Sequence, residues 1–261
     1  MTPVALTIAG SDPSGGAGLQ ADLKTFQQHG VYGMSVVTLL TVQNTRAVSA
    51  VEVLDPALVR AQLDAVLADI PPTAAKTGAL GGAGVIEVVA ERAARFTFPL
   101  VVDPVMVSKH GHALLDPAAA DVLRRRLLPR AFLVTPNMPE AAALAELEVL
   151  DVPGMEAAAR RIALCGARHV LVKGGRLPGQ AVDVLFSDGE LHRFATPRTD
   201  TPHVHGTGCV FAAAVTARLA RGVPLAAAVQ GAKAFVAAAI RTAPGLGGGC
   251  GPVNLFAAPG A

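Results

Sequence analysis

Charged residues are scarce in this chain: they make up 16% of its 261 residues, while hydrophobic residues make up 51%. Such a balance excludes disorder driven by charge and predicts a large buried core. The 22 basic and 20 acidic residues are interspersed, with tight basic clusters only at Arg124–Arg126 and Arg160–Arg161. Because these arginines fall in helical patterns, we interpret them as solvated helix faces and expect no nucleic-acid partner.

Cysteine is scarce as well. Cys165, Cys209 and Cys250 are odd in number and form no Cys-x-x-Cys pair, which argues against a disulfide framework and a structural zinc site. No basic leader precedes the apolar run Val4–Ala9, so we expect a strand there rather than a signal peptide. The uncharged stretch Thr25–Thr45 holds too many polar residues to span a membrane. We therefore expect a soluble, cytoplasmic protein.

Short apolar runs alternate with alanine-rich segments of helical spacing. The runs predict strands at Val4–Ala9, Val36–Leu40, Ala74–Thr77, Leu100–Asp103, Phe132–Thr135 and Val170–Lys173. The segments between them predict helices at Pro56–Ile70, Gly84–Arg95, Pro117–Leu127, Pro139–Leu147 and Met155–Cys165. Since the runs are apolar on both faces, we predict an α/β fold, a three-layer αβα sandwich with a mostly parallel central sheet.

The C-terminal part has a different pattern. Asp183–Phe186 and Leu191–Phe194 flank a turn at Ser187–Glu190, which predicts a hairpin, and two helices follow it. We expect residues beyond Pro244 to be irregular. No long linker and no repeat of fixed period interrupts the chain, so we predict one domain over residues 1–261.

Polar residues follow each predicted strand. In an open parallel sheet, ligands bind beyond the carboxyl ends of the strands. These loops are rich in Asp, Asn, Lys and Gly, which suits a phosphate and metal site better than an apolar pocket. They are Gly10-Ser11-Asp12, Gln43-Asn44, Lys76-Thr77-Gly78, Asp103-Pro104, Thr135-Pro136-Asn137 and Lys173-Gly174-Gly175.

The segment Gly10–Gly18 joins the first strand to a helix that begins near Ala17. Its glycines let the backbone approach a ligand closely, but the Lys-Ser/Thr pair of a Walker A loop is absent after Gly15. A plain turn and a binding loop are equally good interpretations of this segment alone. Asp22 lies one helical turn further on and either faces the loop or is a solvated helix carboxylate.

A second glycine segment, His205–Cys209, runs directly into an apolar helix. Glycines at a helix N-terminus leave N–H groups free to bind phosphate oxygens, and the helix dipole adds to the attraction, so we predict an anion hole. Cys209 falls in the first turn, where the dipole lowers a thiol pKa and favours a role as base. Alternatively, Cys209 is a small buried residue that packs the helix.

Three further positions have two interpretations each. Asn137 and Glu140 suit either the orientation of a hydrated Mg²⁺ between ATP phosphates or a helix capping box. Asp103 ends a strand and is either part of a metal site or a turn residue. Lys173 ends another strand and is followed by two glycines. This position suits a cation that reaches the ATP phosphates, and the alternative is a surface lysine.

Together and in this order, these motifs are specific. The chain resembles the hydroxymethylpyrimidine/phosphomethylpyrimidine kinases of thiamine biosynthesis, members of the ribokinase-like superfamily, over nearly all of its length. The resemblance implies a ribokinase-like fold, two successive ATP- and Mg²⁺-dependent phosphorylations of a hydroxymethylpyrimidine, and a homodimer. It rests on Leu6–Phe26, Val42–Thr45, Asp103–Met106, Leu133–Glu140, Lys173–Gly175 and His205–Cys209.

The resemblance also implies individual roles. Substrate contacts are implied for Asp22 and Gln43, with Ala17 and Val105 as pocket walls. The anion hole and the catalytic base are implied at Gly206, Thr207, Gly208 and Cys209. Lys173 would contact ATP, and Asp103 and Glu140 would organise Mg²⁺.

The chain departs from the family pattern at a few positions. Ala79 stands where the family usually has a methionine against the pyrimidine, while His203-Val204 and Cys250 replace other common residues. A wider pocket favours pyridoxal/pyridoxine kinase as the nearest alternative. A non-catalytic pyrimidine- or nucleotide-binding module is the alternative from another class, although the residues of the anion hole, Lys173 and Glu140 are all present.

Overall fold

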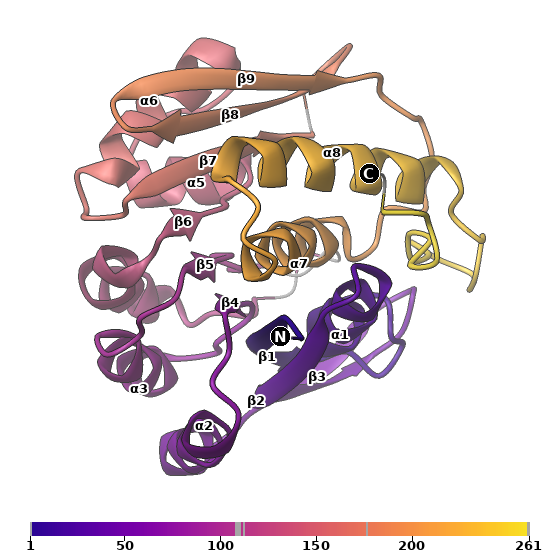
Figure 1. Ribbon diagram of the computed structural model, residues 1–261. Helices are drawn as coiled ribbons and strands as arrows, with labels where there is room; N and C mark the ends of the chain where they lie inside the picture. The colour runs from indigo at the N-terminus through magenta and orange to yellow at the C-terminus, as the bar shows by residue number, and fades with distance from the viewer. Residues whose placement is uncertain (1, 108–110, 112, 176, 260–261) are drawn as a thin grey trace.

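A computed structural model describes residues 2–107, 111, 113–175 and 177–259 of the chain. Its strands form one sheet in the order β3-β2-β1-β4-β5-β6-β7-β8-β9 (Figure 1). The neighbouring pairs from β2 to β7 are parallel, while β3, β8 and β9 join antiparallel. The strands are β1 Val4–Ser11, β2 Tyr32–Gln43, β3 Val48–Val53, β4 Ala74–Thr77, β5 Leu100–Val102, β6 Leu133–Val134, β7 His169–Gly174, β8 Ala181–Ser187 and β9 Glu190–Thr196.

Two helical layers cover the two faces of this sheet, as Figure 1 shows. The layer of α1, α7 and α8 packs on one face, and α2 to α6 pack on the other. The predicted mostly parallel αβα sandwich is therefore confirmed. The helices are α1 Gly18–Gln28, α2 Pro56–Asp69, α3 Ala83–Ala93, α4 Ala120–Val122, α5 Met138–Ala145, α6 Val152–Ala163, α7 Thr207–Ala220 and α8 Leu225–Arg241.

Burial explains why the short strands form where they do. Almost all of β1 and β7 is buried on both faces, as expected for strands covered by helices on each side. The hairpin of β8 and β9 turns at Asp188 and Gly189, which both adopt positive φ, as a tight two-residue turn requires. The predicted hairpin and the two closing helices are confirmed.

Two details of the sequence prediction were wrong. The single helix expected over Pro117–Leu127 is a short 3₁₀ turn, the brief α4 and a wider π turn over Leu123–Leu127. This broken path buries Leu123 and Leu127 while Arg124 pairs with Asp121 and Glu146. Strand β3 was not predicted. It is an edge strand in which only Val48 is buried, so its apolar residues do not mark one buried face.

Among the described residues, the longest apolar helices fall short of what crossing a membrane requires.

Candidate active site

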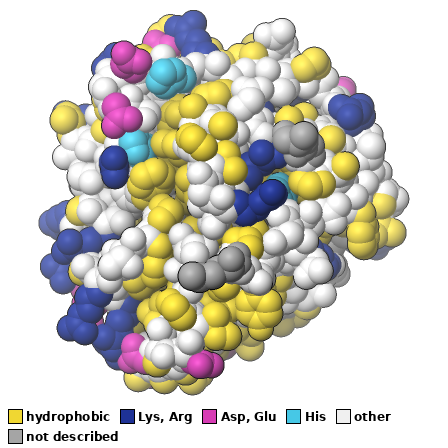
Figure 2. Space-filling view, in the orientation of Figure 1, with side chains coloured by type: hydrophobic (Ala, Val, Ile, Leu, Met, Phe, Trp, Pro, Cys, Tyr) yellow, Lys and Arg dark blue, Asp and Glu magenta, His cyan; other side chains and the backbone are white. Residues whose placement is uncertain are grey.

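A cavity of about 470 Å³ opens at the carboxyl ends of the parallel strands, where α7 begins. On the face shown in Figure 2, basic side chains lie near the centre among hydrophobic ones. All of the predicted site residues except Asp22 line this cavity, so the fold brings together loops that are far apart in sequence. They are Ala17, Gln43, Asp103, Val105, Glu140, Lys173, Gly206, Thr207, Gly208 and Cys209.

The N-terminus of α7 has the form of an anion hole. Gly206 is the N-cap residue, with φ of 80° and no side-chain cap, and the hydroxyl of Thr207 donates to the carbonyl of Val204 at 2.6 Å. The first N–H groups of a helix have no partner in the preceding turn, and the helix dipole favours negative charge there. The amide of Thr207 donates to the carbonyl of Val204 at 3.4 Å, whereas the amides of Gly208 and Cys209, two residues that line the cavity, suit phosphate oxygens.

Replacing Gly206 by alanine should destabilise the protein through two effects, a strained backbone conformation and a steric clash. A matched variant at Gly222 measures the first effect alone. Alanine at Gly206 would adopt a left-handed conformation and place its Cβ against the carbonyl oxygen of Gly16. Gly222 has a φ of 78° but open space around it, so Gly222→Ala meets only the conformational penalty of about 1–2 kcal/mol. We expect Gly206→Ala to lose clearly more stability in urea unfolding. Equal losses would contradict the close packing of the two glycine loops.

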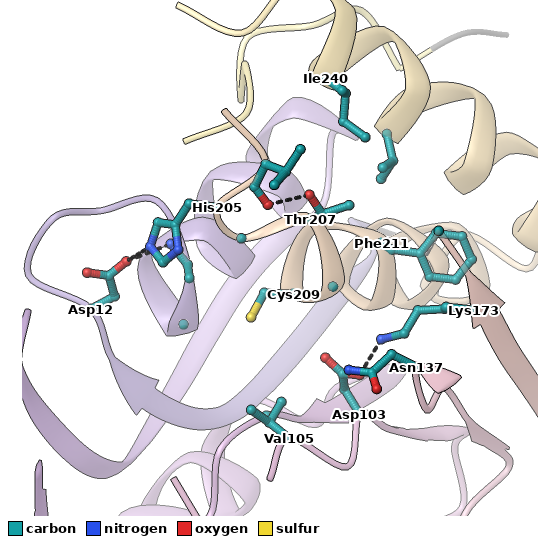
Figure 3. A pocket seen from close by; sticks show the side chains of 18 of the residues that line it. Asp12, Asp103, Val105, Asn137, Lys173, His205, Thr207, Cys209, Phe211 and Ile240 are labelled. Carbon is teal, nitrogen blue, oxygen red and sulfur yellow. Dashed lines mark hydrogen bonds and ion pairs between the residues drawn. The ribbon is translucent and has the colours of Figure 1, made fainter. Parts of the chain in front are cut away.

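Cys209 lies in the first turn of α7. In the cavity it stands between Asp12 and His205 on one side and Lys173 and Asp103 on the other (Figure 3). Burial, with the charge of Asp22 as the next cause, raises the pKa of Cys209 to about 12. The sequence prediction of a lowered thiol pKa is thus wrong for the free protein: desolvation outweighs the opposing effects of Lys76 and the Gly18 amide. Cys209 is a thiol at neutral pH, not a preformed thiolate.

Lys173 and Asp103 form the charged side of the cavity. The ammonium nitrogen of Lys173 lies 2.8 Å from Oδ1 of Asp103, which also accepts from the hydroxyl of Thr135 at 3.1 Å (Figure 3). Burial alone lowers the pKa of Lys173, but the carboxylates of Asp103 and Glu140 outweigh burial and raise it above its ordinary value. Lys173 therefore stays protonated, and its 14% side-chain exposure excludes the surface-lysine interpretation.

Asn137 and Glu140 confirm the capping-box interpretation, and the interpretation as residues that orient Mg²⁺ stays a prediction. They form a complete capping box for α5, with the Asn137 side chain accepting from the Glu140 amide at 3.0 Å and Oε2 of Glu140 accepting from the Asn137 amide at 2.8 Å. Both residues also line the cavity. A local cap therefore fixes the carboxylate of Glu140 at the charged side of the site.

Glu140 should make stability depend on pH. Burial raises the pKa of Glu140 to about 7, with Asp103 adding to the shift and Lys173 opposing it. A carboxyl with a raised folded-state pKa stabilises the protein below its unfolded pKa of about 4.5, and this contribution is lost as pH rises through about 7. Glu140→Gln keeps the capping geometry and removes the titration.

We therefore expect the wild type to lose more stability than Glu140→Gln between about pH 5 and pH 8 in urea unfolding. Glu148→Gln, at an exposed position nearby, is the matched control and should follow the wild type. Parallel pH profiles for the wild type and Glu140→Gln would contradict the raised pKa.

Asp22 lies behind the cavity rather than in its lining. The carboxylate is fully buried, with Oδ2 at 2.7 Å from the ammonium nitrogen of Lys76 and 2.6 Å from the hydroxyl of Thr7. The interpretation as a solvated helix carboxylate is therefore wrong. A lysine within the apolar run Ala74–Thr77 was the available signal, because a charge on a buried strand requires a buried partner.

Sequence reasoning missed two other buried pairs in the cavity wall. Asp12 and His205 pair at 2.8 Å, and Lys233 pairs with Asp183 at 2.7 Å. The second oxygen of Asp183 accepts from the amide of Gly174 at 2.9 Å and so holds the turn after Lys173. No signal for these pairings exists in the sequence, since each joins residues at least 50 positions apart.

Apolar side chains of the two closing helices complete the cavity. Phe211 of α7 and Val236 and Ile240 of α8 line it beyond Lys173. Figure 3 shows Phe211 close to Lys173, while Asp12 and His205 lie on the opposite side of Cys209. The cavity thus has one end with a cation and apolar walls and another end with hydrogen-bonding side chains.

Residues 12–254 of the chain match the phosphomethylpyrimidine kinase family. The chain belongs to this family. It is 51% identical over 95% of its length to the thiamine biosynthesis bifunctional protein ThiED of Geobacter sulfurreducens, of which it spans about half. It is 47% identical to the hydroxymethylpyrimidine/phosphomethylpyrimidine kinase of Synechococcus elongatus over 97% of both chains. The family is one of phosphotransferases, and the expected enzyme class is confirmed.

The fold agrees with a solved kinase structure. The pyridoxal kinase of Staphylococcus aureus in complex with AMP-PCP and pyridoxal is 38% identical and superimposes with a TM-score of 0.91, covering 98% of this chain and 94% of the other. The ribokinase-like fold expected from the motifs is therefore confirmed. AMP-PCP is an ATP analogue, so this relative supports ATP as the phosphoryl donor of the family.

Proposed function

We propose that the chain phosphorylates 4-amino-5-hydroxymethyl-2-methylpyrimidine with ATP, and then phosphorylates the monophosphate to the diphosphate, in thiamine biosynthesis. Membership of the phosphomethylpyrimidine kinase family gives the reaction class. One observation carries the proposal: the first turn of α7, with Cys209 in it, lies between a polar end of the cavity and a cationic end. This arrangement suits transfer between two ligands that meet at an anion hole.

The polar end would hold the pyrimidine and the cationic end the nucleotide. Ala17, Val105 and the amide of Gln43 line the polar end. Lys173 would bind the ATP phosphates, and the backbone N–H groups of Gly206–Cys209 would stabilise the charge of the transferred phosphoryl group. The hydroxymethyl oxygen attacks the γ-phosphorus of ATP in line, the bond from that phosphorus to the bridging oxygen breaks and ADP leaves. The thiolate form of Cys209 accepts the proton of the hydroxymethyl group.

We propose Asp103 and Glu140 as the residues that hold Mg²⁺. Among the described residues, no group of three or more His, Cys, Asp or Glu side chains has the geometry of a metal cage. Two carboxylates beside a phosphate site fit Mg²⁺, which binds through one or two carboxylates together with waters and substrate phosphates. When bound, Mg²⁺ neutralises phosphate charge. Calorimetric titration of Mg²⁺ into the Asp103→Asn variant with and without AMP-PCP tests this assignment.

The deciding experiment offers hydroxymethylpyrimidine, its monophosphate and pyridoxal separately to the purified protein with ATP and Mg²⁺, and measures ADP release. Turnover of both pyrimidines is the expected result. Turnover of pyridoxal alone would replace the proposal with a pyridoxal kinase. Binding without turnover of any of the three would favour the non-catalytic module.

Pyridoxal phosphorylation is the second candidate because of two observations. The Staphylococcus aureus pyridoxal kinase has the same fold at a TM-score of 0.91. Ala79, which lines the cavity, is smaller than the methionine usual for pyrimidine kinases and leaves room for a larger ring. The three-substrate comparison ranks the two candidates directly.

We also propose that residues 1–261 form a single domain, because the described strands make one continuous sheet. The homodimer expected from the family resemblance stays a prediction, which light scattering on the purified protein tests.

A further inference from the structure

Asp12 accepts hydrogen bonds on both oxygens of its carboxylate. Oδ1 accepts from the amide and the hydroxyl of Ser14 at 2.9 and 2.7 Å, and Oδ2 accepts from the amide of Ala17 at 2.8 Å. Asp12 is only 3% exposed. Although burial opposes its charge, the bonds from His205 and Ser14 lower the pKa of Asp12 below its ordinary value, so it is an ionised acceptor at neutral pH.

His205 is the fourth partner of this carboxylate. Its Nε2 atom lies 2.8 Å from Oδ2 of Asp12, and the side chain is only about 5% exposed. An ionised carboxylate has acceptors alone, so a hydrogen bond at this distance requires a hydrogen on Nε2 of His205. The buried carboxylate thus decides which ring nitrogen carries the hydrogen, as a second partner does for many functional histidines.

Gln43 meets the same ring nitrogen from the end of β2. The side-chain amide group of Gln43 lies 3.2 Å from Nε2 of His205, with its nitrogen on that side. Two N–H groups that face each other cannot form a hydrogen bond. The oxygen and nitrogen of a carboxamide exchange places by a half-turn of the group, and the surrounding hydrogen bonds decide between the two orientations.

We infer that Asp12 and His205 act as positioning residues which hold the Gln43 carboxamide with its oxygen toward His205 and its NH₂ group toward the cavity. The Nε2–H group of His205 then donates to a carboxylate oxygen of Asp12 and to the side-chain oxygen of Gln43. In this orientation no N–H group faces another N–H group. Three segments that are distant in sequence, the first glycine loop, the end of β2 and the loop before α7, meet in this contact.

This orientation selects a chemical feature of the substrate. A side chain that offers NH₂ pairs with a hydrogen-bond acceptor, such as a ring nitrogen without a hydrogen, whereas the opposite orientation would pair with an exocyclic amine. The choice of pyrimidine as the ligand rests on the proposed function, but the hydrogen on Nε2 of His205 does not. The two can therefore fail separately.

Nitrogen-15 NMR of the free, wild-type protein tests the first step without any turnover. The His205→Gln spectrum identifies the His205 signals by their loss. We expect Nε2 of His205 to show the chemical shift of a nitrogen that bears hydrogen. A shift typical of a bare, pyridine-like Nε2 would overturn the inference, whatever the substrate of the enzyme proves to be.

A comparison of ligand analogues tests the second step. Hydroxymethylpyrimidine is compared with analogues in which each ring nitrogen in turn is replaced by C–H, by calorimetric titration. We expect the wild type to bind one of these analogues about 10- to 100-fold more weakly, because a buried donor is then left unpaired. In His205→Phe, which keeps a flat ring but donates nothing, the ratio should fall below about 5-fold.

Two controls complete this comparison. His205→Gln places a side-chain N–H near the position of Nε2 and is expected to restore most of the discrimination, with ATP affinity unchanged in both variants. A His205→Phe protein that keeps the full wild-type ratio would overturn the inference. If His205→Phe fails to fold, the NMR result on the wild type still tests the hydrogen on Nε2 of His205, without which the inferred orientation of Gln43 has no basis.

Discussion

Cys209→Ala is expected to slow the first phosphorylation by about 10²- to 10⁴-fold while slowing the second by less than about 10-fold. In the first step the attacking group is an alcohol, which must lose a proton. In the second step the attacking group is a phosphate oxygen, which is already ionised because the second pKa of a phosphate monoester is about 6. Only the first step needs a base at Cys209.

The environment of Cys209 adds a pH dependence. Burial raises the thiol pKa to about 12, so the thiol is almost fully protonated at neutral pH and the thiolate fraction grows about tenfold with each pH unit. The kcat of the first step should therefore rise between about pH 7 and pH 9, while the kcat of the second step stays nearly flat.

Rates of ADP release with the alcohol and with its monophosphate, measured on the same preparation, check both expectations. Cys165→Ala, which changes a free cysteine outside the cavity, is the matched control and should leave both rates unchanged. Equal slowing of the two steps by Cys209→Ala would show that Cys209 shapes the anion hole instead of accepting a proton.

Lys76→Met is expected to lower the free energy of unfolding by about 3–5 kcal/mol. The ammonium nitrogen of Lys76 lies 2.7 Å from Oδ2 of Asp22, and both side chains have no exposed surface. Burial opposes the charge of Lys76, but Asp22, together with the smaller effects of Cys209 and Asp103, outweighs burial and raises the lysine pKa. Without the lysine, Asp22 would be a buried carboxylate with no compensating charge.

The double variant Lys76→Met with Asp22→Asn separates lost charge balance from lost packing. A neutral asparagine keeps a hydrogen-bond partner for Thr7 and leaves no buried charge, so the double variant should recover much of the stability. Thermal unfolding gives the melting temperatures of the single and the double variant. We expect that of the single variant to fall by roughly 6–20 °C. A single variant that melts within about 2 °C of the wild type would contradict the buried pair.

Most strands and helices could be predicted because the pattern of apolar and polar residues within each segment reflects which of its faces are buried. Runs such as Val4–Ala9 and Val170–Lys173 are apolar on both faces, and this pattern alone indicates strands with helices on each side. Strand β3 escaped prediction because an edge strand is exposed and buries little. It pairs antiparallel with β2 at the edge of the sheet.

The candidate site was predictable where a local rule applies. Gly206, Thr207 and Gly208 precede an apolar helix, and a glycine-rich helix N-terminus indicates an anion hole in any fold. Asn137 and Glu140 have the spacing of a capping box, which the structure contains. Each of these features involves residues close together in the chain, so the sequence carries the whole signal.

The sequence by itself determined the alternation of strands and helices, the polar loops at the strand ends and the glycine-rich N-terminus of α7, because periodicity and capping act between near neighbours. Only the tertiary structure decided the partners of the buried charges. Lys76 and Asp22 are 54 positions apart, and His205 and Asp12 are 193 apart, so the order of the strands brings them together. The pKa of Cys209 followed the same logic: a local dipole favours the thiolate, but burial by distant segments opposes it more strongly.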